Sequence, residues 1–554
     1  MHLATKDIVV FLVYFVIVSM YGYWIYRKRK NQEHDSKAFF LAEGSLTWWA
    51  IGASLIASNI SAEQFIGMSG NGYFVGIAVA AYEWIAAVAL IIIAIWFMPV
   101  YLKNKIYTMP QFLKTRYNES VSVIMAVFWL FLYVFVNLTS ILFLGSVAIS
   151  GLVGPEYLHP IMIGLAAFAI FITLGGMKVI GYTDVIQVLV LIIGGLVTVY
   201  IALDQVSGGH GPISGLSKVI NEAPDHFNLI LSKPDASSSQ EYISKYLILP
   251  GILMYAAGQW IANLNYWGCN QYITQRALGA DLPTARKGLV FAAFLKILMP
   301  IIVMLPGIAA FVLVKQGSLS PLENQDKAYS AVLGFLPEGL KGLSVAALTA
   351  AIVASLAGKA NSISTIFTLD IYKKYINRGA DEKKMVITGR VTVLFAMIIA
   401  VLFTWNDLLG IGGAGGFTFI QKYTGFISPG VFAMFLLGLF WKRTTGAAAI
   451  AGLLVGFGLS VFFNEFAPQL LGHETFLYTA YPNGKGGFEI PFLIAMGLAF
   501  MFAVIVMVVM SLAGPKVNPK AFALDKTMFK IKPSLLAMIV VVLMLIAALY
   551  VKFW

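Results

Sequence analysis

The sequence has few charged residues and almost no cysteine. Only 12% of its 554 residues are charged, about half the share in an ordinary soluble domain, whereas 59% are hydrophobic. The single cysteine, Cys269, excludes an intramolecular disulfide and a metal site built from cysteines. The six histidines are scattered, with no spacing typical of metal ligands. These shortages exclude a soluble enzyme and a disordered chain.

The hydrophobic residues form long runs, each close to the ~20 residues that a helix needs to cross a bilayer. The runs are continuous rather than alternating, which predicts helices and not the strands of a barrel. The runs at 119–150 and 341–372 exceed one bilayer thickness and are expected to tilt or to project. We therefore predict an all-α polytopic membrane protein with about fourteen transmembrane helices, at about 7–26, 47–67, 76–101, 119–150, 159–176, 184–205, 247–267, 288–315, 341–372, 385–405, 418–441, 445–466, 490–513 and 532–553.

The basic residues predict the orientation. With the N-terminus outside, 25 Lys and Arg fall in the cytoplasmic connections, Arg116, Arg276 and Arg286 among them, and eight fall outside. An even number of helices then places the C-terminus outside as well. This bias explains the net charge of +12 without nucleic acid, so we expect a multi-pass protein of the cell membrane with no obligatory protein partner.

Signals for catalysis are weak. Residues 410–415 match GxGxxG, but no βαβ unit can surround them, so they indicate a close-packed break and not a dinucleotide site. No Ser/His/Asp constellation is visible, and the longest connection, 206–246, is a loop of about forty residues, which is too short for a catalytic domain. We expect a protein that is not an enzyme.

Polar side chains at membrane depth are the most informative residues, because an ionisable group there costs several kcal/mol unless it is paired or hydrated. Any one of them is also explained by a structural hydrogen bond between helices. Amides and charges beside aromatic residues together suit a neutral ligand with many hydroxyl groups, such as a sugar. The set comprises Glu63, Gln64, Glu83, Asn137, Asp184, Asn263, Lys296, Lys359 and Gln421.

Two of the predicted spans contain signals of a broken helix. The span 47–67 is rich in serine and ends in a glycine-rich stretch, and 418–441 contains Ser428-Pro429-Gly430. Unwound helices at the midplane expose carbonyls that bind small ions and substrate, although small residues also serve as packing faces. The nearby charged residues favour the binding interpretation.

Three stretches carry a family resemblance. Residues 53–67 (ASLIASNISAEQFIG), 263–272 (NLNYWGCNQY) and 361–370 (NSISTIFTLD) resemble the solute:sodium symporter family, closest to its bacterial sodium/galactose, or sodium/glucose-type, members. The resemblance implies an inverted-repeat core of five plus five helices that works by alternating access. It divides the chain into an extra N-terminal helix with a linker (1–46), a first repeat (47–205), an external loop (206–246), a second repeat (247–441) and three further helices (442–554).

The resemblance also implies the residues of a sugar site. Tyr266 would stack on the pyranose ring as an inner gate, with Trp267 behind it, and Met68, Tyr82 and Phe417 would form the outer gate. A serine of the family's site is replaced by Ala86, which leaves the exact sugar open. The remaining residues that would bind the sugar are Gln64, Glu83, Asn137, Asn263, Lys296 and Gln421.

A sodium site is implied in the same way, between carbonyls of Ala57 and Ile60 and, on a later helix, the carbonyl of Ala351 and the hydroxyl of Ser355. A second hydroxyl that the family has at 354 is absent, because the residue is Ala354. Asp184 marks a second cation position in some members, but its serine partner aligns with Gly358.

Lys359 stands beside that glycine, and two interpretations of it remain open. It acts as a tethered cation near Asp184, in place of a second sodium, or it extends to the cytoplasmic surface.

The leading hypothesis is therefore a secondary active symporter that couples a hexose of the galactose/glucose class to sodium. The alternatives are a symporter of the same fold for another sugar or polyol with proton coupling or none, and a sugar sensor. Sodium is the only cofactor expected, and the partners expected are the sugar, sodium and the lipid bilayer.

Overall fold

The computed structural model describes residues 4–27, 46–61, 63–408 and 416–554. In this part of the chain twelve helical segments are long and apolar enough to cross a membrane, and a bent helix pair makes thirteen. The twelve are Thr5–Arg27, Ile77–Lys103, Glu119–Val153, Pro155–Thr173, Gly176–Ser207, Leu282–Lys315, Leu340–Ile376, Glu382–Thr404, Gln421–Phe440, Gly446–Leu471, Phe492–Leu512 and Pro533–Phe553. The all-α membrane class is confirmed, and the two expected long spans have 35 and 37 residues. The count of fourteen is not confirmed.

The first expected break, in span 47–67, is present. Helix α3 (Trp48–Asn59) ends where Ile60 takes an extended conformation, with φ −78° and ψ 113°. The chain resumes as the π-helix η3 (Glu63–Met68) and continues as α4 (Ser69–Phe74). Neither piece is long enough to cross a bilayer alone, which is why this segment is missing from the twelve.

The second expected break, in span 418–441, is also present. Helix α22 (Gly416–Gly425) and helix α23 (Ser428–Phe440) are separated by a turn at Phe426 and Ile427. Pro429 lies in the first turn of α23, where a missing N–H group does not matter, so it starts a helix without disturbing it.

A third break was not predicted. The sequence predicts one span at 247–267, but α13 (Gln240–Ile248) and α14 (Leu253–Ala256) are bent by 81° against α15 (Gly258–Cys269). Ala257, at the bend, has φ −101° and ψ −105°, which is outside the helical region. A Cβ on Gly258 would lie 2.4 Å from the Leu493 carbonyl oxygen, so α15 starts at a place where only glycine lets two backbones approach.

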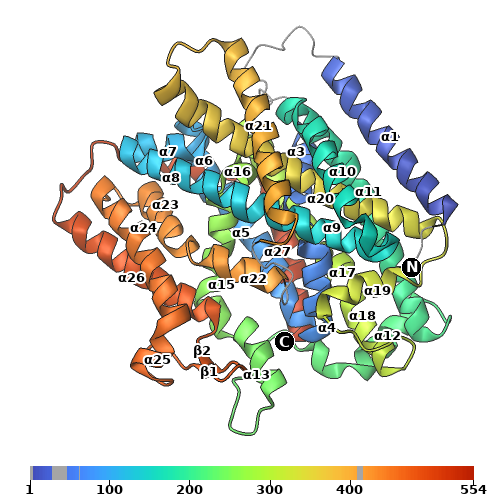
Figure 1. Cartoon of the computed structure of the whole chain (residues 1–554). Helices are drawn as coiled ribbons and strands as arrows, with labels where there is room; N and C mark the ends of the chain where they lie inside the picture. Colours follow the sequence, from blue (N-terminus) through green and yellow to red (C-terminus); the bar gives the residue numbers. More distant parts are fainter. Residues whose placement is uncertain (1–3, 28–45, 62, 409–415) are drawn as a thin grey trace. The chain divides into compact units, whose positions relative to one another are not determined.

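The chain divides into two compact units. Unit 1 comprises Met1–Gly76, Val123–Phe227 and Gln271–Phe417, and unit 2 comprises Ile77–Ser122, Asn228–Asn270 and Thr418–Trp554. In unit 1, helix α20 (Leu340–Thr365) packs against α3, α10 (Leu158–Thr173), α11 (Gly176–Ser207) and α1 (Thr5–Arg27), as can be followed in Figure 1.

In unit 2, α23 and α26 (Phe492–Leu512) pack against each other, and both pack against α15 and α24 (Gly446–Val461). A short antiparallel hairpin, β1 (Tyr481–Pro482) and β2 (Phe488–Glu489), precedes α26 and pairs Tyr481 with Glu489.

The remaining elements complete the two units. In unit 1 they are η6 (Leu132–Leu138), α9 (Thr139–Val153), η7 (Pro155–Tyr157), α12 (Pro212–Glu222), η8 (Pro224–Phe227), α16 (Gln271–Leu278), α17 (Leu282–Val303), α18 (Leu305–Lys315), η9 (Gln325–Lys327), α19 (Ala328–Leu333), η10 (Ile366–Ile376) and α21 (Glu382–Thr404). In unit 2 they are η4 (Ile77–Ala80), α5 (Ala81–Ile92), η5 (Ile93–Phe97), α6 (Met98–Lys103), α7 (Met109–Arg116), η12 (Phe462–Phe466), α25 (Ala467–Leu471), η13 (Lys526–Phe529) and α27 (Pro533–Phe553). Helix α8 (Glu119–Phe131) starts in unit 2 and ends in unit 1.

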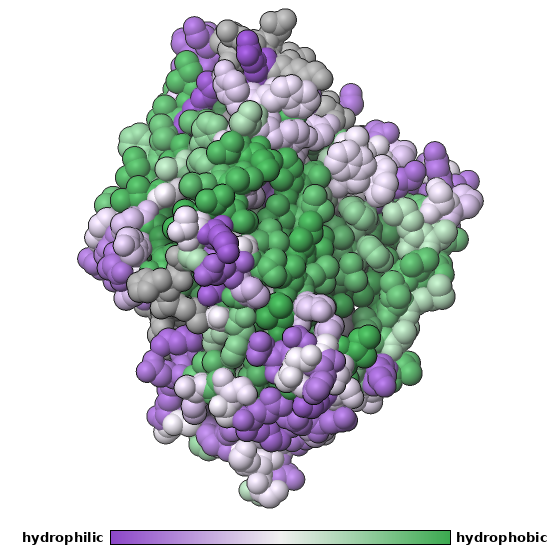
Figure 2. Space-filling model, turned by 90° about the vertical axis from the view of Figure 1, so that its right-hand side faces the viewer, coloured by the Kyte–Doolittle hydropathy of each residue, from purple (hydrophilic) through white to green (hydrophobic). Residues whose placement is uncertain are grey.

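The surface is that of a membrane protein. Figure 2 shows hydrophobic side chains across the middle of one face and hydrophilic side chains toward its upper and lower ends. The membrane-spanning helices themselves expose large hydrophobic residues, such as Met20 (66% exposed) on α1 and Met544 (59%) on α27. Such a surface is stable in contact with lipid and not with water.

Three arginines that the orientation argument counts in cytoplasmic connections are buried. Arg116, Arg276 and Arg286 are 0%, 2% and 6% exposed. The Arg116 guanidinium, which ends α7, donates to the carbonyls of Gly438 (2.7 Å), Trp441 and Thr444 and so satisfies the end of α23. Without the three, 22 basic residues remain on the predicted cytoplasmic side against eight outside, so the orientation stays a prediction with the same sign.

Candidate functional site

A cluster of buried polar side chains lies where α3, α11, α16 and α20 meet within unit 1. Each member is at most 4% exposed, although α11 and α20 belong to segments apolar enough to span a membrane. We call it the polar cluster, and it comprises Ser54, Ser58, Asp184, Tyr272, Arg276, Ser355 and Lys359.

Asp184 and Arg276 form the charged half of the polar cluster. The Ser54 hydroxyl donates to Asp184 Oδ2 (2.5 Å) and accepts from Arg276 Nε (2.8 Å). Arg276 Nη2 lies 3.8 Å from the same carboxylate oxygen. Because the pair is fully buried, each charge depends on the other, and removing one of them is expected to be costly.

The other half of the polar cluster joins the broken end of α3 to α20. The Ser355 hydroxyl donates to the carbonyl oxygen of Ser58 at 3.2 Å. Helix α3 ends one residue later, at Asn59, so the carbonyls of its last turn lack the next turn of helix as donors. The structure therefore brings Ser355 to the stretch between Ala57 and Ile60, while Ala351 lies one turn earlier on α20 and is buried.

Lys359 is buried, at 4% exposure, so the interpretation that it extends to the cytoplasmic surface is wrong. Its ammonium lies 3.5 Å from the Ser355 hydroxyl and 5.0 Å from the centre of the Tyr272 ring. An ammonium at that distance from a ring face is stabilised by the ring quadrupole. Lys359 thus lies next to the predicted sodium ligand Ser355. The cation that pairs with Asp184 is Arg276 and not Lys359.

The glycine at 358 is explained by the same arginine. A Cβ added at Gly358 would lie 2.5 Å from Arg276 Nη2 and 3.0 Å from the Ser58 hydroxyl. A serine therefore does not fit at 358 while the guanidinium is in place. The missing serine and the buried arginine are one structural feature.

The residues predicted to bind the substrate fall in both units. In unit 1 the buried ones are Gln64 on η3, Asn137 on η6 and Lys296 on α17, whose ammonium donates to the side-chain oxygen of Asn59. Met68, a predicted gate residue, is fully buried at the end of η3.

In unit 2 the predicted residues lie mainly on two helices. Glu83 and Tyr82 are buried on α5, and Asn263, Tyr266 and Trp267 share α15. Asn263 donates to the Gln259 carbonyl at 2.9 Å, and the rings of Tyr266 and Trp267 contact each other edge to face.

Two further predicted positions belong to α22. Gln421 is partly exposed there. The structure does not describe the GxGxxG motif at 410–415. The side chains of Phe417 and Glu63 also lie outside the part that it describes.

Sequence reasoning missed Arg276 as a functional candidate. It follows the end of α15 by a few residues, and a hydropathy profile places it in a loop. The sequence signal at this place is limited to three polar residues before Arg276, namely Gln271, Thr274 and Gln275. The structure shows that Thr274 and Gln275 are buried. Gln275 donates to Thr365 on α20 at 2.9 Å, which holds α16 against that helix.

The oxygen atoms at the polar cluster are of the kind that binds a small hard cation. Among the described residues no group of three His, Cys, Asp or Glu comes together as a transition-metal site. Backbone carbonyls at a helix end and a serine hydroxyl, by contrast, are the ligands that transporters use for sodium. Oxygen donors of this kind gather beside Ser355, whereas Arg276 already pairs with Asp184.

Comparison with known proteins gives a consistent family. A family model described as sodium:solute symporter family matches residues 39–456. The chain is 43% identical to a sodium/glucose cotransporter of Vibrio parahaemolyticus, over 99% of this chain and 98% of that one. It is 33% identical to sodium/myo-inositol cotransporter 2 of Oryctolagus cuniculus, over 81% of this chain and 68% of the relative, and 31% identical to sodium/glucose cotransporter 1 of Ovis aries, over 83% and 72%.

A solved structure supports the fold. The outward-open structure of a Na⁺-coupled sialic acid symporter superposes with a TM-score of 0.77, covering 93% of this chain and 99% of the other, at 20% sequence identity. At that identity the likeness concerns the arrangement of the helices alone.

Proposed function

Because the chain belongs to the sodium:solute symporter family, whose members couple solute transport to sodium, we propose that it carries a hexose of the galactose/glucose class by sodium symport. The observation that carries sodium coupling is the contact of Ser355 with the open end of α3, which gathers hydroxyl and carbonyl oxygens at one buried point. The 43% identical sodium/glucose cotransporter supports the choice of a hexose.

The proposed sugar site consists of Gln64, Glu83, Asn137, Asn263, Lys296 and Gln421, with Tyr266 stacking on the ring and Trp267 behind it. Met68, Tyr82 and Phe417 are the proposed outer gate. The set supplies the mixture of amide, carboxylate, ammonium and aromatic groups that binds hydroxyls and the C–H face of a sugar. Glu83, Asn137, Lys296 and Gln421 lie in segments of membrane-spanning length, and Asn263 lies in the bent helix pair; such groups are otherwise costly there.

The proposed sodium ligands are the carbonyls of Ala57, Ile60 and Ala351 and the hydroxyl of Ser355. One sodium ion per sugar is proposed, since the second cation position of the family, at Asp184, is neutralised by Arg276.

A second candidate substrate is a polyol. The relative named sodium/myo-inositol cotransporter 2, at 33% identity, and the alanine at position 86 both favour testing cyclitols beside hexoses. Proton coupling or uniport of the same solute are alternatives that the ion dependence of uptake distinguishes.

The topology is part of the proposal. We place the inverted repeats at 47–205 and 247–441, after the extra helix of 1–46 and the loop 206–246 and before the three helices of 442–554. Both termini face outward from the cell membrane, and the chain carries out transport and not catalysis.

The test is uptake of labelled galactose, glucose and myo-inositol into proteoliposomes, with and without an inward sodium gradient. The decisive variant is Asn263→Ala, and Asn464→Ala is its matched control. Both asparagines are 7% exposed in unit 2, and each donates to the carbonyl four residues earlier. We expect Asn263→Ala to lower uptake by about five- to 140-fold, as for an unpaired group of about 1–3 kcal/mol, and Asn464→Ala to keep it. Equal uptake by the two variants would refute the sugar site, and uptake that ignores sodium would refute the coupling.

A further inference from the structure

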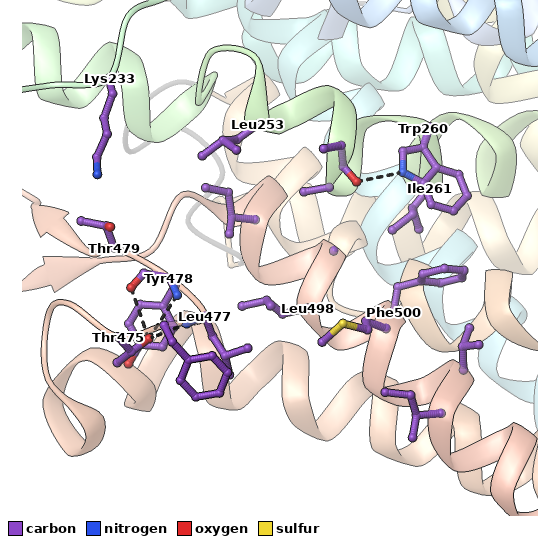
Figure 3. Close-up of a pocket in the computed structure, with 18 of the residues that line it drawn as sticks. Lys233, Leu253, Trp260, Ile261, Thr475, Leu477, Tyr478, Thr479, Leu498 and Phe500 are labelled. Atoms are coloured by element: carbon purple, nitrogen blue, oxygen red, sulfur yellow. Dashed lines mark hydrogen bonds between the residues drawn. The ribbon is translucent and has the colours of Figure 1, made fainter.

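A long pocket lies within unit 2, away from the polar cluster. It has a volume of about 660 Å³ and runs between the elbow of α14 and α15, one face of α26 and the segment 475–481. Figure 3 shows Lys233 and Thr479 at one end of it and Trp260 and Phe500 at the other.

The polar side chains of this pocket lie toward one end, apart from the Trp260 indole N–H, which donates to the Ala256 carbonyl (Figure 3). Lys233, Thr475 and Thr479 belong to the two connections before α13 and α26, and the opposite end is lined by aliphatic and aromatic side chains alone. The Tyr478 hydroxyl donates within its own segment, toward the Ala467 and Gly472 carbonyls, so it is not offered to a ligand. The pocket therefore suits a molecule with a small anionic head and a long apolar tail.

The length of the apolar part matches a lipid chain. The α26 residues that line it begin at Ile494 and end at Ile505 and recur every three or four positions, as one face of a helix does. Eleven residues rise by about 16 Å, and half of the hydrocarbon core of a bilayer is about 15 Å. The pocket thus extends from the level of the headgroups to the middle of the membrane, within one leaflet.

The wall of the pocket is open to the membrane. Met501 and Ile505 are 40% and 47% exposed on a helix that spans the bilayer, and Leu253, on the other wall, is 46% exposed. A chain from the surrounding lipid reaches the pocket sideways, without crossing water.

We propose that this pocket binds one anionic phospholipid, with an acyl chain along α26 and the phosphate at Lys233. The chain would fill the elbow at Ala257 that sets the angle of α15. The proposal holds whatever solute the protein carries, because it concerns a surface outside the proposed sugar and sodium sites.

Native mass spectrometry of the purified full-length protein tests it, with dioleoyl phosphatidylglycerol and dioleoyl phosphatidylcholine as probes. We expect one tightly held phosphatidylglycerol and about tenfold weaker retention of phosphatidylcholine, because the choline cation of the latter offsets the charge of its phosphate and repels Lys233. Lys233→Gln should remove the preference, whereas Lys485→Gln, which changes an exposed lysine of the β1–β2 hairpin outside the pocket, should retain it.

A second pair of variants tests the place of the acyl chain. Leu498→Trp fills the pocket and should abolish retention of both lipids, whereas Val509→Trp, on α26 outside the pocket and 62% exposed, should leave it unchanged. Equal binding of the two lipids by the unmodified protein, or an unchanged preference in Lys233→Gln, would overturn the anionic headgroup. Normal retention by Leu498→Trp would overturn the pocket as the site. Lys233→Gln alters only an exposed side chain. If Leu498→Trp fails to fold, the lipid preference of Lys233→Gln therefore still tests the proposal.

Discussion

Replacing Arg276 by methionine is expected to convert Asp184 from an ion-pair partner into a cation site. Methionine keeps much of the length and apolar volume of the arginine but provides no charge. In the variant the carboxylate of Asp184 remains fully buried, with the Ser54 hydroxyl (2.5 Å) as the hydrogen bond that the structure gives it. A sodium ion would then restore the missing positive charge.

The expected magnitudes follow from the burial of both partners. Breaking a buried ion pair by removing one side costs about 3–5 kcal/mol, so Arg276→Met should be clearly less stable than the unmodified protein in sodium-free buffer. Sodium at ten times its dissociation constant should return about 1.4 kcal/mol. The double variant Arg276→Met with Asp184→Asn carries no buried charge there, and its stability should lie closer to that of the unmodified protein.

The assay is thermal unfolding of detergent-solubilised protein in choline and in sodium chloride at equal ionic strength, followed by sodium activation of uptake. We expect the sodium-dependent rise in Tm to be larger for Arg276→Met than for the unmodified protein and not to be larger for the double variant. The Hill coefficient for sodium should be near one in the unmodified protein. A coefficient near two there, or an Arg276→Met variant as stable as the unmodified protein without sodium, would refute the ion-pair argument.

Substitutions at Tyr266, Asp7 and Gly358 give further expectations. Tyr266→Phe should leave sugar uptake almost unchanged and Tyr266→Ala should reduce it severely, because stacking needs the ring and not the hydroxyl; concentration-dependent uptake measures both. Asp7→Ala removes two hydrogen bonds, of 2.7 and 2.8 Å, that N–H groups at the start of α20 donate to the carboxylate. Its Tm should fall by the equivalent of about 1–3 kcal/mol. Lys6→Ala breaks an exposed ion pair, and its Tm should change little. Gly358→Ser should destabilise the protein by about 1–3 kcal/mol, and combining it with Arg276→Met should cost less than the sum of the two, which thermal unfolding of the four proteins tests as a double-mutant cycle.

The sequence predicts the parts of this fold that hydropathy and composition control. Long apolar runs identified the spanning helices, and serine, glycine and proline at 54–72 and 428–430 identified two helix breaks where the structure has them. The bend at Ala257 was missed because it depends on the close approach of Gly258 to the Leu493 backbone, a contact between segments more than two hundred residues apart.

The same limit applies to the candidate site. Asp184 stands out in the sequence as an ionisable residue within an apolar run, and the family resemblance implies Ser355; the structure brings both into the polar cluster. Arg276 did not stand out in the sequence, because it follows an apolar run. Its burial comes from the packing of α16 on α3 and α20. A charge at the end of a span has the same hydropathy whether it faces water or the protein interior, so a single sequence does not distinguish the two.

The ion pair also bears on how far the protein concentrates its substrate. After releasing its substrate and sodium, a symporter must change back to its starting conformation without them. A buried carboxylate without a partner would make that step costlier by several kcal/mol. Arg276 removes this cost, because it is part of the chain and stays paired with Asp184 when no sodium is bound. With one sodium per sugar, a tenfold sodium gradient (about 1.4 kcal/mol) and 100 mV (about 2.3 kcal/mol) together support an accumulation of about 500-fold. Two sodium ions would square that ratio, to above about 100,000-fold. Sugar accumulation in proteoliposomes at a clamped potassium diffusion potential measures the ratio through its dependence on the sodium gradient: uptake energetics that scale with the first power of the gradient agree with Arg276 in place of a second sodium, and a dependence on its square contradicts it.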